Sequence, residues 1–380
     1  MLKILHISNT DIAFDSRILK ELEAFVSVPS FNVSAIGVPD GTNYTQATIA
    51  GVSYYQAPMR SRLFSFLPRA ARYALELIEF TIKIVKKGRH IRPNIVHCHD
   101  TFALPAGWLL QKLCSSKLVY DAHELESNKN GQNILLSKAT LLIERFCWPQ
   151  IDLLVSVSDS ITDWYMKNLG IKPSVLVLNS PVLAISDKAR DSDTRYFNQQ
   201  FNIPSEHLVF VYLGILGSGR GIETCLHAFA AGPSNAHVVF IGYGLLETQI
   251  KDAAQKHSNI HFHPPVRHDE VVSLVSNADY GLCLVENVSL SDFYCLPNKL
   301  FEYSFAKIPV LASHFPEIAK VVNQYNLGIC CDPNPTSVRK TLENIIANKP
   351  IFTPADISSL SWETQAQRLI DAYRHHLLNL

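Results

Sequence analysis

The chain has 380 residues, of which 47% are hydrophobic and 18% are charged, and its 34 basic residues balance its 34 acidic residues. This length exceeds what one ordinary core needs and predicts two domains of roughly 150–200 residues each. A net charge of zero argues against a dedicated nucleic-acid-binding protein, which would carry a basic excess.

In the first half, short apolar runs alternate with amphipathic stretches. The runs predict strands at Lys3–Ser8, Asn94–His97, Leu118–Tyr120, Leu153–Val157 and Val175–Leu178. The stretches predict helices at Ser16–Ser27, Ala106–Leu113, Leu135–Trp148 and Ile161–Asn168.

A polar stretch, Pro181–Pro204, is expected to link the halves, and the alternation then resumes. Its strands are predicted at Leu208–Leu213, His237–Ile241, Ile260–His263, Tyr280–Val285, Pro309–Ser313 and Gly328–Cys331. Its helices are predicted at Gly221–Ala231, Leu246–Lys256, Asp269–Ser276, Lys299–Phe305 and Ser337–Ala347. A last helix is predicted at Ser361–Leu378.

Such alternation predicts an α/β protein with parallel sheets covered on both faces. We expect two Rossmann-like, doubly wound domains, residues 1–182 and 183–360, facing each other across a cleft that holds the site. Residues 361–380 are expected to pack back on the first domain.

The cysteines and the apolar runs bear on localisation. None of the eight cysteines forms a C-x-x-C pair, which favours reduced thiols and argues against a zinc site. The N-terminus lacks the apolar core of a signal peptide, and no apolar run approaches the roughly 20 residues that span a bilayer. We expect a cytoplasmic protein, with peripheral association to the inner face of the cell membrane as an open alternative.

The stretch VYLGILGSGRGIE leads from a predicted strand through a glycine-rich loop into a helix. Gly214, Gly217 and Gly219 would let backbone N–H groups approach a phosphate, and Arg220 would add a positive fork suited to a diphosphate. The alternative is an ordinary glycine-rich turn with a solvent-facing arginine.

A second stretch, LPNKLFEYSFAKIPVLAS, places Asn298 and Lys299 in the first turn of a helix. A lysine there opposes the helix dipole, and a bound diphosphate would explain it. Glu302 lies on nearly the same face and could accept hydrogen bonds from the two hydroxyls of a ribose. The alternative is an exposed helix with a Lys–Glu pair.

These segments resemble the donor-binding domain of retaining GT-B glycosyltransferases, specifically glycosyltransferase family four. The resemblance extends over the chain through FIGYG, which contains Gly242, and through SLSWETQ near the end. In the first half it rests on DSRILKE, IVHCHD, VYDAHE, VSVSDSI and VLVLNSP.

The resemblance implies a hexosyltransferase that moves a sugar, with retention, from a nucleotide-diphosphate sugar to a saccharide or a lipid-linked saccharide in surface polysaccharide synthesis. Arg220 and Lys299 would neutralise the diphosphate, and Glu302 would match the second Glu of the family's Glu-x7-Glu motif. The first Glu of that motif falls at Tyr294, a departure from the pattern. No Asp-x-Asp pair is placed to hold a metal, so we expect neither a metal nor a cofactor.

Polar residues also gather at two predicted strand ends of the first half. They are His97, His99 and Asp100 after one strand, and Asp121, His123 and Glu124 after the next. His123 is the best single catalytic candidate, to orient a sugar or to move protons near neutral pH. His99, Asp100, Glu124, Asp15 and Arg17 are the acceptor-side candidates. The alternative is that each histidine is a structural polar residue.

The segment Met59–Arg92 holds nine basic residues, interleaved with Leu63, Phe64, Phe66 and Leu67. This composition is typical of an element that rests on anionic lipid, or of a solvated helix with core aromatics.

Two alternative functions are compatible with this fold or with these donor contacts. A sugar-nucleotide epimerase or a phosphorylase would use the same fold, and a non-catalytic sugar-nucleotide-binding subunit would use the same donor contacts.

Overall fold

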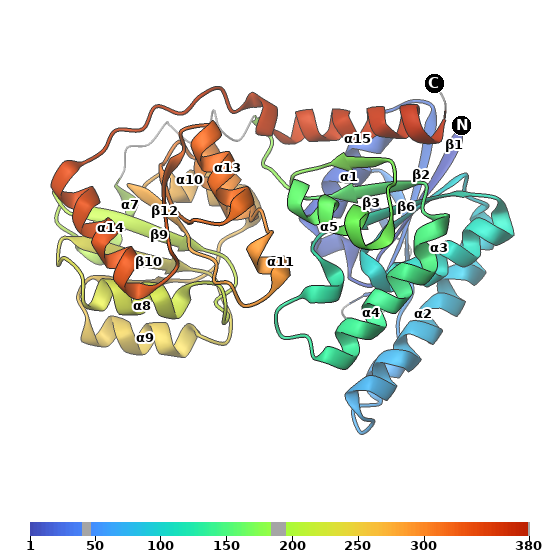
Figure 1. The fold of residues 1–380 in the computed structure, drawn as a ribbon, viewed down its shortest axis with the longest axis horizontal. Helices are drawn as coiled ribbons and strands as arrows, with labels where there is room; N and C mark the ends of the chain where they lie inside the picture. The colour runs from blue at the N-terminus through green and yellow to red at the C-terminus, as the bar shows by residue number, and fades with distance from the viewer. Residues whose placement is uncertain (40–46, 184–194, 379–380) are drawn as a thin grey trace. The chain divides into compact units, whose positions relative to one another are not determined.

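The structure is a computed structural model that describes residues 1–39, 47–183 and 195–378. The chain divides into two compact units (Figure 1). Unit 1 comprises Met1–Val177 and Ala366–Leu380, and unit 2 comprises Leu178–Gln365. Each unit is a sheet with helices packed against it.

Unit 1 contains a sheet with the strand order β3-β4-β2-β1-β5-β6-β7-β8, parallel except for the β3–β4 pair. Its strands are β1 (Leu2–Ile7), β2 (Phe31–Gly37), β3 (Ala47–Ile49), β4 (Val52–Gln56), β5 (Ile95–His99), β6 (Lys117–Ala122), β7 (Leu153–Ser156) and β8 (Ser174–Leu176). β5 and β7 are buried along their whole length, as expected for strands covered on both faces.

The helices of unit 1 include a layer in which α3 packs against both α2 and α4. The helices are α1 (Ser16–Val26), α2 (Arg69–Ile91), α3 (Asp100–Cys114), α4 (Ile134–Cys147) and α5 (Asp159–Leu169). Short 3₁₀ turns lie at η1 (Ile12–Phe14), η2 (Ser61–Leu63), η3 (Glu126–Asn128) and η4 (Trp148–Gln150). The last helix, α15 (Trp362–Leu377), contributes Tyr373, whose hydroxyl lies 2.6 Å from Nδ1 of His97.

Unit 2 contains an all-parallel sheet with the order β11-β10-β9-β12-β13-β14. Its strands are β9 (Leu208–Leu213), β10 (Ala236–Ile241), β11 (Ile260–His263), β12 (Tyr280–Cys283), β13 (Val310–Ser313) and β14 (Gly328–Cys331). Its helices are α7 (Tyr196–Phe201), α8 (Ile222–Ala230), α9 (Glu247–Lys256), α10 (Val271–Val275), α11 (Leu290–Phe293), α12 (Asn298–Phe305), α13 (Pro316–Gln324) and α14 (Pro335–Asn348). Two 3₁₀ turns are η5 (His268–Glu270) and η6 (Ser358–Leu360).

The predicted fold class, two parallel-sheet α/β domains, is confirmed. The prediction missed β2, β3 and β4, because Asn32, Ser34 and Ser53 break the apolar runs of β2 and β4, and β3 is only 3 residues long. It also began α3 at Ala106 instead of Asp100, because Pro105 lies inside the helix.

The cysteines and the helices bear on the redox state and on membrane insertion. All eight cysteines are free thiols. No helix in the described ranges combines the length and the apolar character that crossing a bilayer requires.

Candidate functional site

In unit 2, the strand β9 leads through the glycine loop, residues 214–221, into helix α8. Gly221 has φ +80°, and a Cβ on it would lie 1.7 Å from the carbonyl oxygen of Leu284. Gly242 has φ +148°, and its Cβ would lie 1.9 Å from the carbonyl oxygen of Gly214. Only glycine fits such approaches, so the loop is held tightly against the ends of β10 and β12.

Lys299 lies beside the strand that leads into this loop. Its Nζ is 3.6 Å from the centroid of the Tyr212 ring on β9, and the Tyr212 hydroxyl donates to the carbonyl of Ile215 in the loop at 3.1 Å. Lys299 is the second residue of α12, which begins at Asn298 without a side-chain cap from Pro297. The first N–H groups of a helix have no partner within the helix, so an ammonium and helix amides occur together here.

Two glutamates flank this arrangement. Glu302, one turn along α12, is buried, and its Oε1 lies 3.9 Å from Nδ1 of His268. Glu286 follows β12, and its N–H donates to the carbonyl of Gly219 at 3.0 Å. The Glu286 carboxylate accepts a hydrogen bond from the Thr224 hydroxyl at 2.8 Å. Glu286 therefore fixes the glycine loop to α8, a role that sequence reasoning missed because no motif marked it.

The remaining donor-side candidates lie around the loop and α12. Arg220 is exposed and immediately precedes Gly221, the N-terminal cap of α8. Tyr294 is half-buried and caps the C-terminus of α11. Gly217 has room for a Cβ, since its nearest neighbour would be a methyl of Ile215 at 3.8 Å. The roles of these residues stay predictions.

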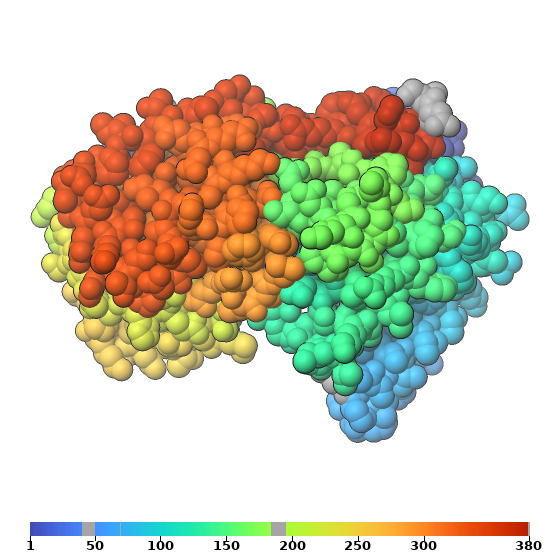
Figure 2. Space-filling model, in the orientation of Figure 1, coloured from blue at the N-terminus to red at the C-terminus, as the bar shows by residue number. Residues whose placement is uncertain are grey.

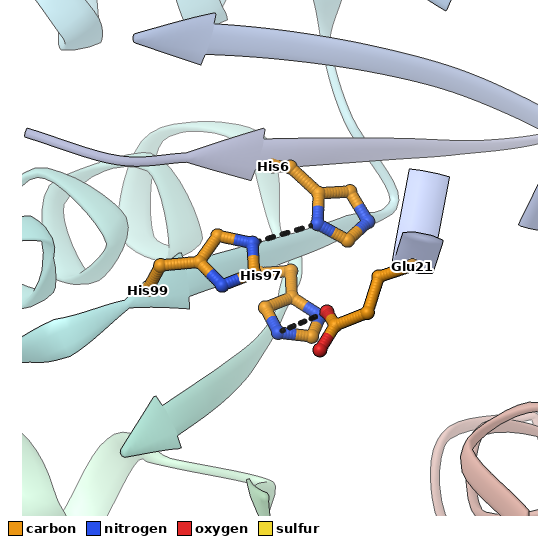
Figure 3. Close-up of side chains that lie close together, drawn as sticks. All are labelled: His6, Glu21, His97 and His99. Carbon is orange, nitrogen blue, oxygen red and sulfur yellow. Dashed lines mark hydrogen bonds and ion pairs between the residues drawn. The ribbon is translucent and has the colours of Figure 1, made fainter. Parts of the chain in front are cut away.

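In unit 1, the carboxyl ends of β1, β5 and β6 bring together a histidine cluster, which we define as His6, His97, His99 and His123 with Arg17, Glu21 and Asp121 (Figure 3 shows four of its members). Nδ1 of His6 lies 3.0 Å from Nε2 of His99, and Nδ1 of His99 lies 3.2 Å from Nε2 of His123. These contacts form one hydrogen-bonded row from the core to the partly exposed His123.

Asp121 is the anionic centre of the histidine cluster. Nε2 of His123 donates to its Oδ2 at 3.1 Å, and Nη2 of Arg17 donates to its Oδ1 at 2.8 Å. Arg17 also donates to the carbonyl of Val177 at 2.9 Å. Because the aspartate is buried, these two cations are what keeps its charge compatible with the core.

The charges follow from burial and these partners. Burial opposes a charge on His123, but the carboxylates of Asp100 and Asp121 outweigh it and raise the pKa of His123 to about 10. Burial lowers the pKa of His97 to about 3, with neighbouring His99 adding to the effect. The same causes lower the pKa of His6 well below its usual value. At neutral pH His123 is thus an imidazolium that donates hydrogen bonds, while the histidines behind it are neutral.

Four members of the cluster meet the distance requirement for a metal site. One ligand atom each of His6, Glu21, His97 and His99 lies within 4.8 Å of the others. However, His6 and His99 already point ring nitrogens at each other at 3.0 Å. The His97 ring lies 4.5 Å from that of His6 and at only 20° to it. A ligating imidazole holds a metal in its own ring plane, so near-parallel rings at this spacing favour a hydrogen-bonded cluster over a metal site.

The predicted acceptor residues divide by exposure. Arg17 and His99 are buried and have protein partners, so solvent does not reach them in this structure. Glu124 is exposed, and Asp15 and Asp100 are partly exposed. Asp15 caps α1 and lines a cavity of 300 Å³ together with Asn9, Asp11 and Arg62. Sequence reasoning could not separate these cases, because burial depends on strand order.

Comparison with known proteins identifies the class. The chain matches two family models: Glycosyltransferase Family 4 over residues 40–180, and Glycosyl transferases group 1 over residues 193–364. It is 22% identical over 316 residues to the D-inositol 3-phosphate glycosyltransferase of Corynebacterium diphtheriae, covering 76% of this chain and 72% of the relative.

Solved structures agree on the fold. Sucrose-phosphate synthase from Thermosynechococcus elongatus matches with a TM-score of 0.76 at 13% identity, over 100% of both chains. The HepE protein of Anabaena, in complex with UDP, matches with a TM-score of 0.71 at 14% identity, over 98% of both chains.

The fold and the family matches together define this protein as a glycosyltransferase with the GT-B fold. Its first half carries the family-four signature, and its second half carries the group-1 signature.

Proposed function

We propose that this enzyme transfers a hexose, with retention of configuration, from a nucleoside-diphosphate sugar to a saccharide or lipid-linked saccharide in the synthesis of surface polysaccharide. The observation that carries the donor assignment is the position of Lys299 in the first turn of α12. Its ammonium is held over the ring of Tyr212, whose hydroxyl binds the glycine loop. An ammonium, helix amides and a loop of glycines are together suited to a diphosphate.

Each residue of the proposed donor site binds one part of the nucleotide sugar. Lys299 and Arg220 neutralise the diphosphate, and the N–H groups of Asn298 and Lys299 bind its oxygens. The buried carboxylate of Glu302 accepts hydrogen bonds from the ribose hydroxyls. Tyr294 offers one hydroxyl to the sugar in place of the carboxylate that the family pattern has there.

Donor chemistry in this proposal needs no metal and no cofactor. Stabilisation of the departing diphosphate comes from the fixed cations Arg220 and Lys299 and from the helix amides, which act where negative charge develops. Turnover should therefore persist in the presence of a chelator.

UDP is the first nucleotide to test, because the HepE protein of Anabaena was solved with UDP. A thermal-shift series with UDP, GDP, ADP and CMP sugars compares bases directly, since a ligand that binds only the folded state raises its melting temperature. We expect a UDP sugar to give the largest shift in the wild type, and Glu302→Gln to reduce it. Equal shifts in both proteins would contradict the ribose assignment.

Unit 1 supplies the acceptor side of the proposal. His123, as an imidazolium, is a fixed hydrogen-bond donor that orients a sugar hydroxyl, so orientation is favoured over proton shuttling near neutral pH. Asp15, Asp100 and Glu124 offer carboxylates to acceptor hydroxyls. Arg17 and His99 act through Asp121 and His123, as positioning residues.

We also propose that unit 1 rests on an anionic membrane surface through the α2 face, defined as Leu63, Phe66, Leu75, Ile78 and Ile82. Phe66 is 79% exposed and Ile82 is 62% exposed. Arg62 and Arg72 lie in the same segment, whereas nothing is described for the side chain of Arg69. In Figure 2, α2 and α4 lie on one face of unit 1. Exposed apolar side chains in a segment that also carries cations suit an anionic bilayer.

A further inference from the structure

A groove in unit 1 lies between helix α2 and the strands β2 and β4. It is a cavity of 870 Å³. The strand side contributes Ile36, Tyr55, Gln56, Ala57 and Pro58, and Arg60 follows them. The helix side contributes Glu79, Lys83, Lys86, Lys87 and His90. None of these residues belongs to the donor site or to the histidine cluster.

Among the described residues that line the groove, one lysine and the one carboxylate neutralise each other. Nζ of Lys83 lies 2.6 Å from Oε1 of Glu79 and also donates to the carbonyl of Pro58. Glu79 further accepts from the N–H groups of Arg60 and Ser61, at 3.0 and 2.7 Å. Partial burial opposes the charged form, but these donors lower the pKa of Glu79 to about 2. The carboxylate of Glu79 is thus already paired within the protein, and it connects α2 to the strand side of the groove.

Three cations of the groove remain. Arg60, Lys86 and Lys87 have no carboxylate partner among the residues that the structure describes. Nζ of Lys87 lies 3.7 Å from the centroid of the Tyr55 ring, which holds it at the groove wall. Cations kept together without counter-charges attract an anion, and ammonium groups act as point charges for phosphate.

Apolar surface borders these cations. Ile36, Ala57 and Pro58 line the groove itself. On α2, the groove residues follow positions 79, 83, 87 and 90, and the exposed Leu75, Ile78 and Ile82 form a neighbouring stripe. At 3.6 residues per turn the two stripes are about a quarter of a turn apart. The groove therefore opens beside the apolar α2 face.

We propose that this groove binds the phosphate group of an anionic amphiphile, a phosphate- or diphosphate-bearing head carried on a hydrocarbon chain. Arg60, Lys86 and Lys87 bind the phosphate, and the apolar wall and the α2 face receive the start of the chain. The inference rests on the glycosyl transfer proposed above, because it names the class of the acceptor: a saccharide linked through phosphate to a lipid.

The groove also adjoins the acceptor end of unit 1. Arg62, two residues after Arg60, donates from Nη2 to the carbonyl of Asn9 at 3.0 Å. Asn9 and Arg62 line the smaller cavity of 300 Å³ that contains Asp11 and Asp15. A phosphate in the groove would leave the attached sugar near carboxylates, which suit hydroxyl groups.

The test is a binding measurement on the full chain with farnesyl diphosphate, kept below its aggregation concentration. Inorganic diphosphate and farnesol, offered separately, supply the anion and the chain alone. We expect farnesyl diphosphate to bind at least about tenfold more tightly than either inorganic diphosphate or farnesol. The double variant Lys86→Gln with Lys87→Gln should weaken the binding of farnesyl diphosphate by about tenfold or more. Arg89→Gln is the matched control, because Arg89 lies on the same helix outside the groove and should leave binding unchanged.

The outcomes are distinguishable from those of the donor proposal. Equal binding of inorganic diphosphate and farnesyl diphosphate would reduce the groove to a general anion site and overturn the amphiphile assignment. Equal loss in the Arg89 variant would also overturn it, since net charge alone would then explain binding. Binding of a UDP sugar without binding of farnesyl diphosphate would reject the groove proposal and leave the donor site in place. Binding of farnesyl diphosphate without binding of a UDP sugar would reject the donor site and leave the groove proposal in place.

Discussion

At the residue scale, Lys299 shows how one side chain is placed by two elements. Its position in the first turn of α12 is set by the sequence Pro297–Asn298, and its ammonium is held by the Tyr212 ring of β9. The sequence predicted the first constraint, because proline and asparagine favour helix starts. It could not predict the second, because nothing in the chain order pairs residue 212 with residue 299.

Lys299→Met should keep the side-chain stem over Tyr212 while removing the charge. We expect kcat/KM to fall by about 100-fold, as for the loss of one strong transition-state contact, and affinity for the nucleoside diphosphate to fall as well. Initial rates and calorimetric titration with UDP measure the two effects. Lys256→Met, an exposed lysine at the end of α9, is the matched control. Wild-type values for Lys299→Met would remove it from the donor site.

His123 gives a prediction with a pH signature. A histidine in the unfolded chain has a pKa near 6.5, whereas the pKa of His123 in the fold is about 10. The folded state therefore holds this proton more tightly, so its stabilisation is fully present below about pH 6.5 and is lost as pH rises toward about 10. The melting temperature of the protein should fall across that window, by roughly 4 °C or more.

The His123→Asn variant should lose this pH-dependent fall, while His375→Asn, an exposed change on α15, should keep it. We further expect His123→Asn to lower turnover strongly and leave UDP affinity unchanged, because the donor contacts belong to unit 2. Unchanged turnover at pH 7.5 would reject His123 as a site residue, even if the melting curve behaved as expected.

The same scale shows what sequence reasoning could and could not predict. VYDAHE and IVHCHD identified the polar strand ends correctly, since carboxyl ends of neighbouring parallel strands share one edge. Sequence reasoning did not separate the partly exposed His123 from the buried His99. The burial of each histidine depends on the placement of β5 and β6 between β1 and β7 in the sheet. Glu21 and Tyr373 were missed as partners of the cluster, since they reach it from helices distant in sequence.

At the element scale, hydrophobic periodicity predicted the central strands of the sheets better than the strands toward a sheet edge. Strands such as β9 and β10 were located correctly, because burial on both faces makes them almost entirely apolar, with His237 as the exception in β10. β2 and β4 were missed, since they lie toward the edge of their sheet and mix polar with apolar residues. That edge is where the groove beside α2 lies, so the missed strands concealed the groove as well.

Helix α2 makes a prediction about membranes. Phe66→Glu/Ile82→Glu places two anions on the α2 face, where Leu63, Leu75 and Ile78 are also exposed. Binding to phosphatidylglycerol vesicles in a flotation assay should fall at least about fivefold, because each change removes apolar contact and adds repulsion. Added salt should weaken the wild-type interaction through screening.

Ile351→Glu is the matched control for this surface. Ile351 is 92% exposed in unit 2, so the same change there should leave flotation unaltered. No flotation of the wild-type protein at low salt would remove the membrane proposal altogether. Neither Phe66 nor Ile82 lines the groove beside α2, so this variant tests the membrane surface while leaving the cations of the groove in place.

At the scale of the whole molecule, two parallel-sheet units do not by themselves fix a reaction. The family matches identify a glycosyltransferase, while an epimerase could use the same fold with a nucleotide sugar alone. The two chemistries differ in what must be consumed. A transferase leaves the donor sugar unchanged until an acceptor is present, whereas an epimerase converts the donor without one.

The last prediction therefore concerns the fate of the sugar. With UDP-glucose alone, we expect no epimerised nucleotide sugar by NMR, even at high enzyme concentration. With a lipid-linked saccharide acceptor, we expect UDP release in step with sugar transfer, and the H1–H2 coupling constant of the product should report the same anomeric configuration as the donor. Chelator should leave the rate unchanged, because Arg220 and Lys299 supply the positive charge in the proposed mechanism. An inverted product would refute retention but not transfer, and a new epimer without acceptor would refute transfer as the main reaction.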